Sequence, residues 1–315
     1  MLKKSVMLLI VLFLVIGASG CNTEDDDKDA DTDKVFIGGN DGLDVGFIEN
    51  EPPTDVYDGD QDPFMVSLFL TNKGEFTIPV GGVIASLSGL SQDAFGLSEI
   101  NTRSKTVIEA KSKIGVDIVS GDNEILQFQE LVYKPDLLSD FKTDLKIDFC
   151  YQYETNGLAN VCLKQNPVRR GEADLCEVNN DNLGGESSAA PLSVVDYRQT
   201  AKADKVVLSF KIKNEGNGIV YSPGAFSDTC YDNRVQKDYL NVKVKSGSMD
   251  LTITCPKLGD SNQGEIRIVG GGERTILCDI GTSDLQDSAF EEPFDIILSY
   301  NYKGTLKKTI TVLAE

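Results

Sequence analysis

The chain has 315 residues, a formal net charge of -20 at pH 7, and neither histidine nor tryptophan. Such an excess of negative charge repels nucleic acid and anionic lipid surfaces, so we expect no nucleic-acid partner. The absence of histidine removes the most common general base and metal ligand, and it excludes every Ser-His or Cys-His nucleophile pair.

The first 21 residues have the pattern of an export signal. Lys3 and Lys4 form a basic start, and an uncharged, mostly apolar run follows over residues 5–20. This run is shorter than the roughly 20 apolar residues that a transmembrane helix needs. The small residues before Cys21 resemble the lipobox of prokaryotic lipoproteins, in which the cysteine receives a lipid and becomes the new N-terminus. We expect a lipid anchor at Cys21 that holds the protein on the extracellular face of the cell membrane; the alternative is a cleavable signal with an incidental cysteine.

Residues 22–34, NTEDDDKDADTDK, predict an acidic, solvated tether, because no aliphatic residue larger than alanine is present to join a core. Their D-x-D-x-D spacing recurs at Asp58, Asp60 and Asp62 and is similar to the start of a calcium loop. The glycine and glutamate that such a loop needs at positions 6 and 12 are missing, and Pro63 occupies position 6 of the second run. We therefore predict no metal site and no cofactor.

From residue 35 onward, apolar residues recur with the period of two that is typical of strands. The stretches VSLFLTNKG (66–74) and LSFKIKNEG (208–216) align without a gap, and each ends in an Asn-x-Gly turn. IDFCYQYET (147–155) and IILSYNYKG (296–304) also align, and we expect a turn and a returning strand after each Tyr-x-Tyr. The spacing between the two members of the first pair differs from that of the second pair by the length of a short loop insertion. The chain is interpreted as one unit present twice.

Short strands separated by frequent turns predict an all-β, antiparallel fold. We expect two tandem immunoglobulin-like β-sandwich domains at residues 35–166 and 191–315, joined by a linker at 167–190 that is rich in Gly, Asn and charge. Without tryptophan, the tryptophan-over-disulfide core of antibody domains is absent. The expected likeness is therefore one of architecture.

The cysteines other than Cys21 number six, which is an even number suited to disulfides in an exported chain. Cys150 and Cys162 are placed symmetrically about the dipeptide at 156–157. We therefore predict a disulfide between them across a hairpin.

In the second half, Cys255 and Cys278 are each expected on the inward, apolar face of a strand, and we predict a disulfide between them in the core. Cys176 in the linker would then pair with Cys230. Four cysteines allow three connectivities, so the other two pairings remain alternatives.

Several short motifs occur together along the chain: GGNDGL at 38, ENEPP at 49, LTNKGEF at 70, CYQYET at 150, VCL at 161 and DLCEV at 174. In this order they resemble a family of uncharacterised exported archaeal proteins that carry tandem Ig-like domains behind a membrane anchor. The resemblance implies an archaeal cell-surface setting. It implies no site residues, because no activity is assigned to the family.

No motif stands in the context that a catalytic mechanism requires. Ser139 and Lys142 have the S-x-x-K spacing of serine-lysine acyl enzymes, but the supporting S-D-N and K-T-G elements are missing. We therefore predict no enzyme and no catalytic residues. We expect a binding or adhesion module whose partner is a protein or glycan at the cell surface; the alternative is a structural part of the envelope that self-associates through sheet edges.

Overall fold

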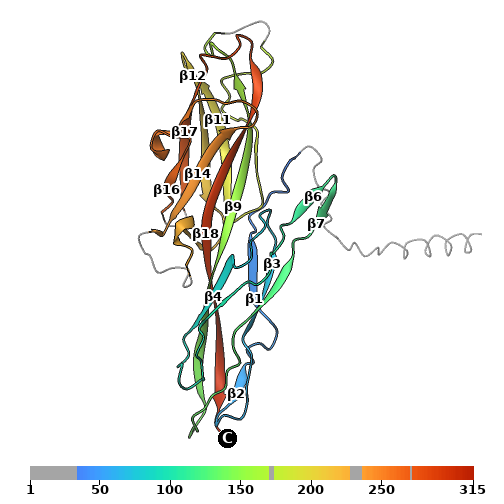
Figure 1. Cartoon of the computed structure of the whole chain (residues 1–315), viewed down its shortest axis with the longest axis vertical. Helices are drawn as coiled ribbons and strands as arrows, with labels where there is room; N and C mark the ends of the chain where they lie inside the picture. Colours follow the sequence, from blue (N-terminus) through green and yellow to red (C-terminus); the bar gives the residue numbers. More distant parts are fainter. Residues whose placement is uncertain (1–33, 170–173, 228–235, 270–271) are drawn as a thin grey trace, which may run out of the picture.

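Two very long strands, β9 (Phe141–Leu163) and β18 (Phe290–Leu313), run side by side through the length of the molecule (Figure 1). This computed structural model describes residues 34–169, 174–227, 236–269 and 272–315. The two strands pair antiparallel from Phe141 opposite Val312 to Leu163 opposite Phe290, so that every residue of β9 has a partner in β18. We call this pairing the long ladder.

The long ladder is the centre of a nine-stranded sheet with the order β16-β14-β18-β9-β4-β5. Three further strands, β2, β10 and β13, pair with one of the two long strands, and β2 alone among these described pairs is parallel. The bounds are β2 (Asp55–Tyr57), β4 (Val83–Ser88), β5 (Asn101–Arg103), β10 (Gly185–Ser187), β13 (Ile219–Tyr221), β14 (Tyr239–Ser246) and β16 (Gln263–Arg267).

Two smaller sheets supply the second layer of the molecule, one beside each half of the long ladder (Figure 1). The sheet of the lower half consists of β1 (Leu43–Phe47), β3 (Ser67–Asn72) and β8 (Asn123–Gln127). The sheet of the upper half consists of β11 (Leu192–Ala201), β12 (Lys205–Asn214), β17 (Glu273–Gly281) and β15 (Ile253–Thr254).

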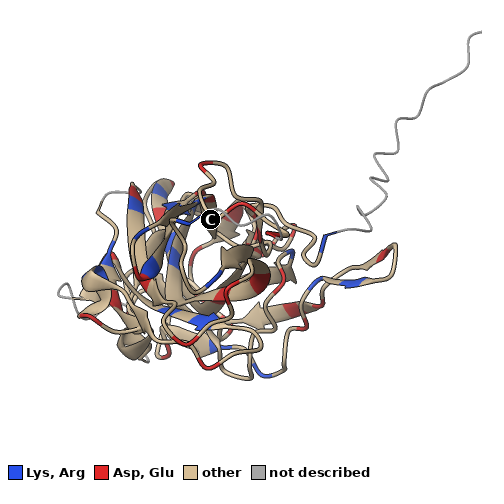
Figure 2. Cartoon of the chain, turned by 90° about the horizontal axis from the view of Figure 1, so that it is seen from above, with Lys and Arg blue, Asp and Glu red and all other residues tan. Residues whose placement is uncertain are grey.

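One hairpin belongs to neither layer. It consists of β6 (Ser112–Ile114) and β7 (Asp117–Val119), which pair only with each other. Figure 2 shows that it stands away from the body. Helical structure in the described ranges is restricted to short turns such as η1 (Pro223–Ala225) and η3 (Pro256–Leu258). None of the described helices has the length and apolarity to span a membrane.

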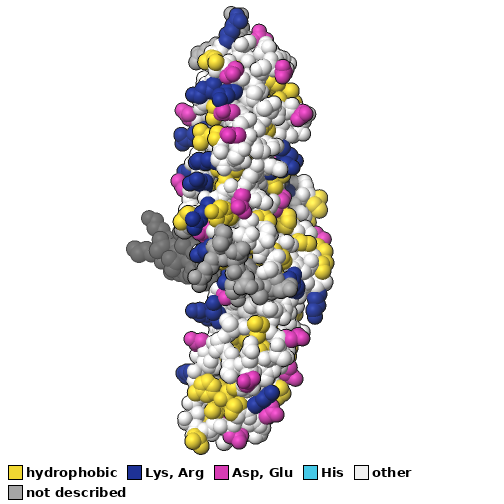
Figure 3. Space-filling view, turned by 60° about the vertical axis from the view of Figure 1, so that its left-hand side comes forward, with side chains coloured by type: hydrophobic (Ala, Val, Ile, Leu, Met, Phe, Trp, Pro, Cys, Tyr) yellow, Lys and Arg dark blue, Asp and Glu magenta, His cyan; other side chains and the backbone are white. Residues whose placement is uncertain are grey.

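The prediction of an all-β, antiparallel fold is confirmed, and its cause is the alternation of side chains along each strand. In β3 the side chains of Leu68 and Leu70 are fully buried while Phe69 between them is exposed, and Leu208 and Phe210 are buried in the same way in β12. One face of each strand therefore packs into the core. The other face carries charged and polar side chains, which Figure 3 shows interspersed along the side of the molecule.

The prediction of a hairpin after each Tyr-x-Tyr is wrong. Asn156 and Gly157 lie inside β9, Gly304 lies inside β18, and none of them has a positive φ. A Cβ atom on Gly157 would lie 2.6 Å from the Tyr197 hydroxyl, and one on Gly304 would lie 2.2 Å from the Phe149 ring. These glycines make room for aromatic side chains and do not form turns.

Because both strands continue, the two repeats exchange their last segments. Residues 141–151 of β9 pair with the C-terminal half of β18, and residues 146–151 also pair with β4. Residues 155–163 pair with the N-terminal half of β18, whose other neighbour is β14. Each half of the sheet therefore contains a segment from the other repeat. The expected domains at 35–166 and 191–315 share one sheet, and an immunoglobulin topology of each half stays a prediction.

The predicted disulfide between Cys150 and Cys162 is also wrong. Both residues lie in β9, twelve positions apart, which at ~3.3 Å per residue separates them by about 40 Å. Cys162 instead pairs with Cys176 across a Cα–Cα distance of 5.8 Å. Cys176 therefore cannot pair with Cys230, which lies outside the described residues. Cys150 is itself disulfide-bonded.

The predicted core bridge between Cys255 and Cys278 is confirmed, and both residues are fully buried. The Cys162–Cys176 bond ties the predicted linker 167–190 to β9. The linker is held further by β10, which pairs with residues 157–159 of β9. It is therefore part of the folded body along much of its length.

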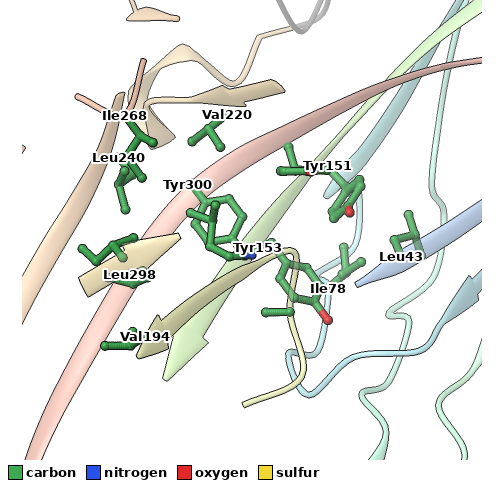
Figure 4. Close-up of a cluster of buried hydrophobic side chains, with 14 of the residues drawn as sticks. Leu43, Ile78, Tyr151, Tyr153, Val194, Val220, Leu240, Ile268, Leu298 and Tyr300 are labelled. Carbon is green, nitrogen blue, oxygen red and sulfur yellow. The ribbon is translucent and has the colours of Figure 1, made fainter. Parts of the chain in front are cut away.

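The repeated Tyr-x-Tyr motifs meet where the two halves join. Tyr153 is the ladder partner of Tyr300 and Tyr151 is the partner of Tyr302, and neighbouring rings lie 5.5–6.3 Å apart between centroids. Figure 4 shows Tyr151, Tyr153 and Tyr300 close together where the two long strands run side by side. Burial raises the pKa of the Tyr151 and Tyr300 phenols well above their usual value, so both stay protonated. Such aromatic pairs each contribute about 0.5–1.5 kcal/mol beyond their buried area.

The repeated asparagines hold this cluster from both sides. The Tyr153 hydroxyl donates to Asn72 Oδ1 at 3.3 Å, and the Tyr302 hydroxyl donates to Asn214 Oδ1 at 3.0 Å. The glycines two residues further on leave space for the same hydroxyls, because a Cβ atom on Gly74 would lie 2.0 Å from the Tyr153 oxygen. Gly74 has no positive φ, so close approach, and not turn geometry, requires glycine here.

Gly74→Ala should lower the free energy of unfolding by about 1–3 kcal/mol, because the added methyl group overpacks the contact with Tyr153. Gly46→Ala is the matched control, since a Cβ atom at Gly46 meets nothing within 4 Å; we expect a change within about 0.5 kcal/mol. Urea unfolding monitored by circular dichroism measures both. Equal stability of the two variants would refute this role for Gly74.

A buried carboxylate fixes the C-terminal half of β18 onto β9. Asp148 accepts hydrogen bonds from Thr305 Oγ1 at 2.5 Å and Lys146 Nζ at 2.9 Å, and Lys303 Nζ lies 3.5 Å away. Burial raises the pKa of Asp148, but the hydrogen bonds from Thr305 and Lys146 and the charge of Lys303 outweigh it, so the pKa lies below its usual value of 3.8.

Because its pKa is lower in the folded state, Asp148 stabilises the fold fully above the unfolded-state value of about 4, and this stabilisation is lost as the pH falls through the folded-state pKa. Asp148→Asn should lower the free energy of unfolding at neutral pH by about 1–3 kcal/mol and should make its decline between about pH 5 and pH 3 shallower. Urea unfolding across this pH range tests both effects. Asp144→Asn is the control, because Asp144 accepts a similar bond from Thr309 at an exposed position. A pH profile unchanged by Asp148→Asn would contradict the assignment.

Candidate functional site

A polar groove lies on the outer face of the nine-stranded sheet in the upper half and encloses about 340 Å³. β16, β14 and β18 lie next to one another there, and their outward side chains form two rows across the sheet. The pairing aligns Glu265, Asn241 and Ser299 in one row. It aligns Gln263, Lys243 and Ile297 in the other. With strands ~4.8 Å apart and rows ~7 Å apart, these six side chains cover about 10 Å by 7 Å.

The groove offers polar groups that the protein itself does not use. The side chains of Asn241, Lys243 and Gln263 make no hydrogen bond or ion pair with another described residue and are exposed. Two other groups are held in place: Ser222 donates to Glu265 Oε1 at 2.6 Å, and Ser299 donates to Glu154 Oε2 at 3.3 Å. The site thus combines positioned acceptors with free amide and ammonium donors.

The local charge of the groove differs from that of the whole chain. Lys243 and Glu265 are its two charged groups and balance each other, although the chain carries -20. The amides of Asn241 and Gln263 can each donate and accept. Ile297 adds an apolar surface at the β18 end of its row. Such an arrangement suits a neutral ligand with many hydroxyl groups better than a strongly charged one.

A second hollow of about 300 Å³ lies at the waist, where the two repeats meet, and three of its charged residues, Lys73, Asp44 and Glu215, are already paired. Lys73 Nζ lies 2.6 Å from Asp44 Oδ2, and this hydrogen bond and the attraction of the carboxylate raise the pKa of Lys73. Glu215 lies 2.7 Å from Lys213. The one described lysine that lines the waist hollow is therefore already paired, whereas Lys243 of the polar groove forms no ion pair with a described residue.

The described chain begins at this waist and is clamped there by two carboxylates. Glu186 accepts hydrogen bonds from the backbone nitrogens of Val35 and Phe36, at 2.7 and 3.1 Å. Glu75 accepts from Ile37 and Gly38, at 2.9 and 3.0 Å. The predicted lipidation residue, Cys21, and residues 22–33 of the predicted tether lie outside the described residues. The clamp fixes where that part of the chain joins the body.

The remaining motifs singled out in the sequence lie apart from the polar groove. Asp58 is buried and accepts from the backbone nitrogens of Leu137 and Glu315, so its carboxylate closes the lower end of the molecule. Within the described ranges, no group of three or more Cys, Asp or Glu is placed to hold a metal ion. Ser139 and Lys142 are both exposed near the start of β9.

No protein-family model matches the chain, and no curated protein matches it either. Among solved structures, the secreted serine protease VesC from Vibrio cholerae aligns over 82% of this chain and 50% of its own, with 11% sequence identity and a TM-score of 0.18. The chain thus spans about half the length of that protein. A TM-score this low supports no argument about fold or function.

Proposed function

We propose that the protein is a non-catalytic binding module, anchored by a lipid on the outer face of an archaeal cell membrane, that recognises a glycan through the polar groove. The observation that carries the proposal is the grid of free amide and ammonium groups and positioned acceptors on three adjacent strands. A neutral glycan presents donors and acceptors at similar spacing and carries no net charge. The exported setting is supported by the disulfides, which persist in oxidising surroundings.

The placement of the groups also supports a glycan over a peptide. A peptide strand that adds to a sheet uses unpaired backbone groups at an edge. The groove lies on the face of the sheet, where β14 is paired on both sides by β16 and β18. Recognition there depends on side chains, so the ligand must present its own hydrogen-bonding groups to that face.

Replacement of Asn241 or Gln263 by alanine should weaken glycan binding about tenfold, because each change removes from the groove an amide that can donate to the ligand and accept from it. Calorimetric titration of the full-length protein with purified envelope glycans and with neutral and acidic oligosaccharides measures this effect. Neutral ligands should bind more tightly than acidic ones, since the chain repels negative charge.

Gln127→Ala is the matched control, because Gln127 is an exposed amide on β8 in the lower half. It should leave binding unchanged, and all three variants should unfold like the original chain. Equal losses in all three, or no glycan bound, would refute the polar groove as the site. Cleavage of a glycan that Glu265→Gln abolishes would reveal an enzyme.

Cys21→Ser should move the protein from the detergent phase to the aqueous phase in a phase-separation assay, because the thiol that accepts the lipid is absent. Mass spectrometry of the mature N-terminus is the companion measurement, and it should find lipid mass on the original chain only. A Cys21→Ser variant that stays in the detergent phase would show that the apolar segment 5–20 is itself the anchor.

A further inference from the structure

The β6–β7 hairpin exposes aliphatic side chains on both sides of its tip. Ile114 is 66% exposed and Val116 is 55% exposed, on either side of Gly115 at the tip, and Ile118 and Val119 are exposed on the returning strand. The ribbon has two strands only, and an isolated two-stranded ribbon is marginally stable in water. An apolar tip of this kind indicates a contact outside the chain.

The hairpin lies where the chain leaves for its N-terminus. Lys113 Nζ donates to the backbone oxygen of Lys34 at 2.6 Å, and Val35 is clamped immediately afterwards by Glu186. The 33 residues before Lys34 include the uncharged run at 5–20 and Cys21. Any anchor in that segment therefore joins the body beside the hairpin.

The end of the hairpin lacks the excess of negative charge that the whole chain carries. The segment 111–119, KSKIGVDIV, holds two lysines and one aspartate, whereas the chain as a whole carries -20. Lysines close to an anionic membrane surface are attracted to it. The aliphatic tip can enter the boundary between headgroups and acyl chains while Lys111 and Lys113 remain at the level of the headgroups.

The position of the hairpin relative to the polar groove is consistent with such a contact. In Figure 1 the hairpin and the start of the described chain lie on the right, whereas β16 and β14, which carry the groove, lie on the left. Figure 2 also shows the hairpin and the chain start projecting on the same side of the body. A membrane on the hairpin side therefore leaves the groove open to the outside.

We infer that the tip of the β6–β7 hairpin inserts into the lipid surface as a second membrane contact, which orients the protein with its polar groove facing outward. This inference rests on the lipid anchor of the proposed function, because tethering supplies the high local concentration that a small apolar tip needs. The anchor holds the chain to the membrane, and the hairpin sets the direction in which the body faces.

The absence of tryptophan makes a direct test possible, because one introduced tryptophan reports its own surroundings. Full-length Val116→Trp is reconstituted into vesicles of phosphatidylcholine and phosphatidylglycerol, with and without brominated acyl chains. The inference expects blue-shifted emission and several-fold stronger quenching by the brominated lipid than in Val269→Trp. Val269 is a matched control, because it is 64% exposed and follows β16 in the upper half. Ile114→Ser in the Val116→Trp background should reduce the quenching.

Each other result counts against the inference in its own way. If the protein sediments with the vesicles but Val116→Trp is quenched only by aqueous acrylamide, the hairpin does not contact lipid and its tip serves a protein partner. If Val269→Trp is quenched equally, the stated orientation is wrong. If the protein fails to sediment with vesicles at all, the proposed anchor is wrong and the hairpin contact falls with it.

Discussion

The pairing of β9 with β18 along their full length is the constraint on which the rest of the structure depends. Since every residue of β9 has a partner in β18, neither half of the nine-stranded sheet is built from one repeat alone. Domains joined by a linker usually meet over a modest, polar interface and move relative to one another. Here the connection is a continuous pair of strands with a buried tyrosine cluster at its centre, so the two halves are held in one fixed arrangement.

This rigid connection fixes the position of the polar groove relative to the waist, where the chain start joins the body. The polar groove is built on β18, on its neighbour β14 and on β16 beyond it. The chain start is clamped by Glu75 and Glu186 at the waist of the same body. No hinge along the long ladder separates them. In the proposed arrangement, the long ladder therefore fixes the orientation of the groove relative to the point where the chain start joins the body.

The sequence predicted the parts of the fold that depend on local alternation. The strands around Leu68 and Phe210, the repeated asparagines and the Cys255–Cys278 bridge all follow from side-chain periodicity. The wrong predictions, the hairpin and the Cys150–Cys162 disulfide, come from the interpretation of glycine. A single sequence does not distinguish a glycine that forms a turn from one that makes room for an aromatic ring. Gly157 was interpreted as a turn, and the misplaced hairpin then brought Cys150 and Cys162 together. The contact with Tyr197 that explains Gly157 is formed across forty positions of sequence and cannot be seen locally.

The sequence did not predict the polar groove, because the residues that form it do not recur in the other repeat. Tyrosine, asparagine and glycine recur at matching positions because both halves contribute the same side chains to the cluster where they join. The surfaces on the outer face differ: Ile84 and Ser86 of β4 are buried beside β9, whereas Asn241 and Lys243 of β14, which occupies the matching place beside β18, are exposed and polar. A repeated residue is explained by the shared scaffold, so recognition is best sought where the repeats diverge, and the polar groove is such a place.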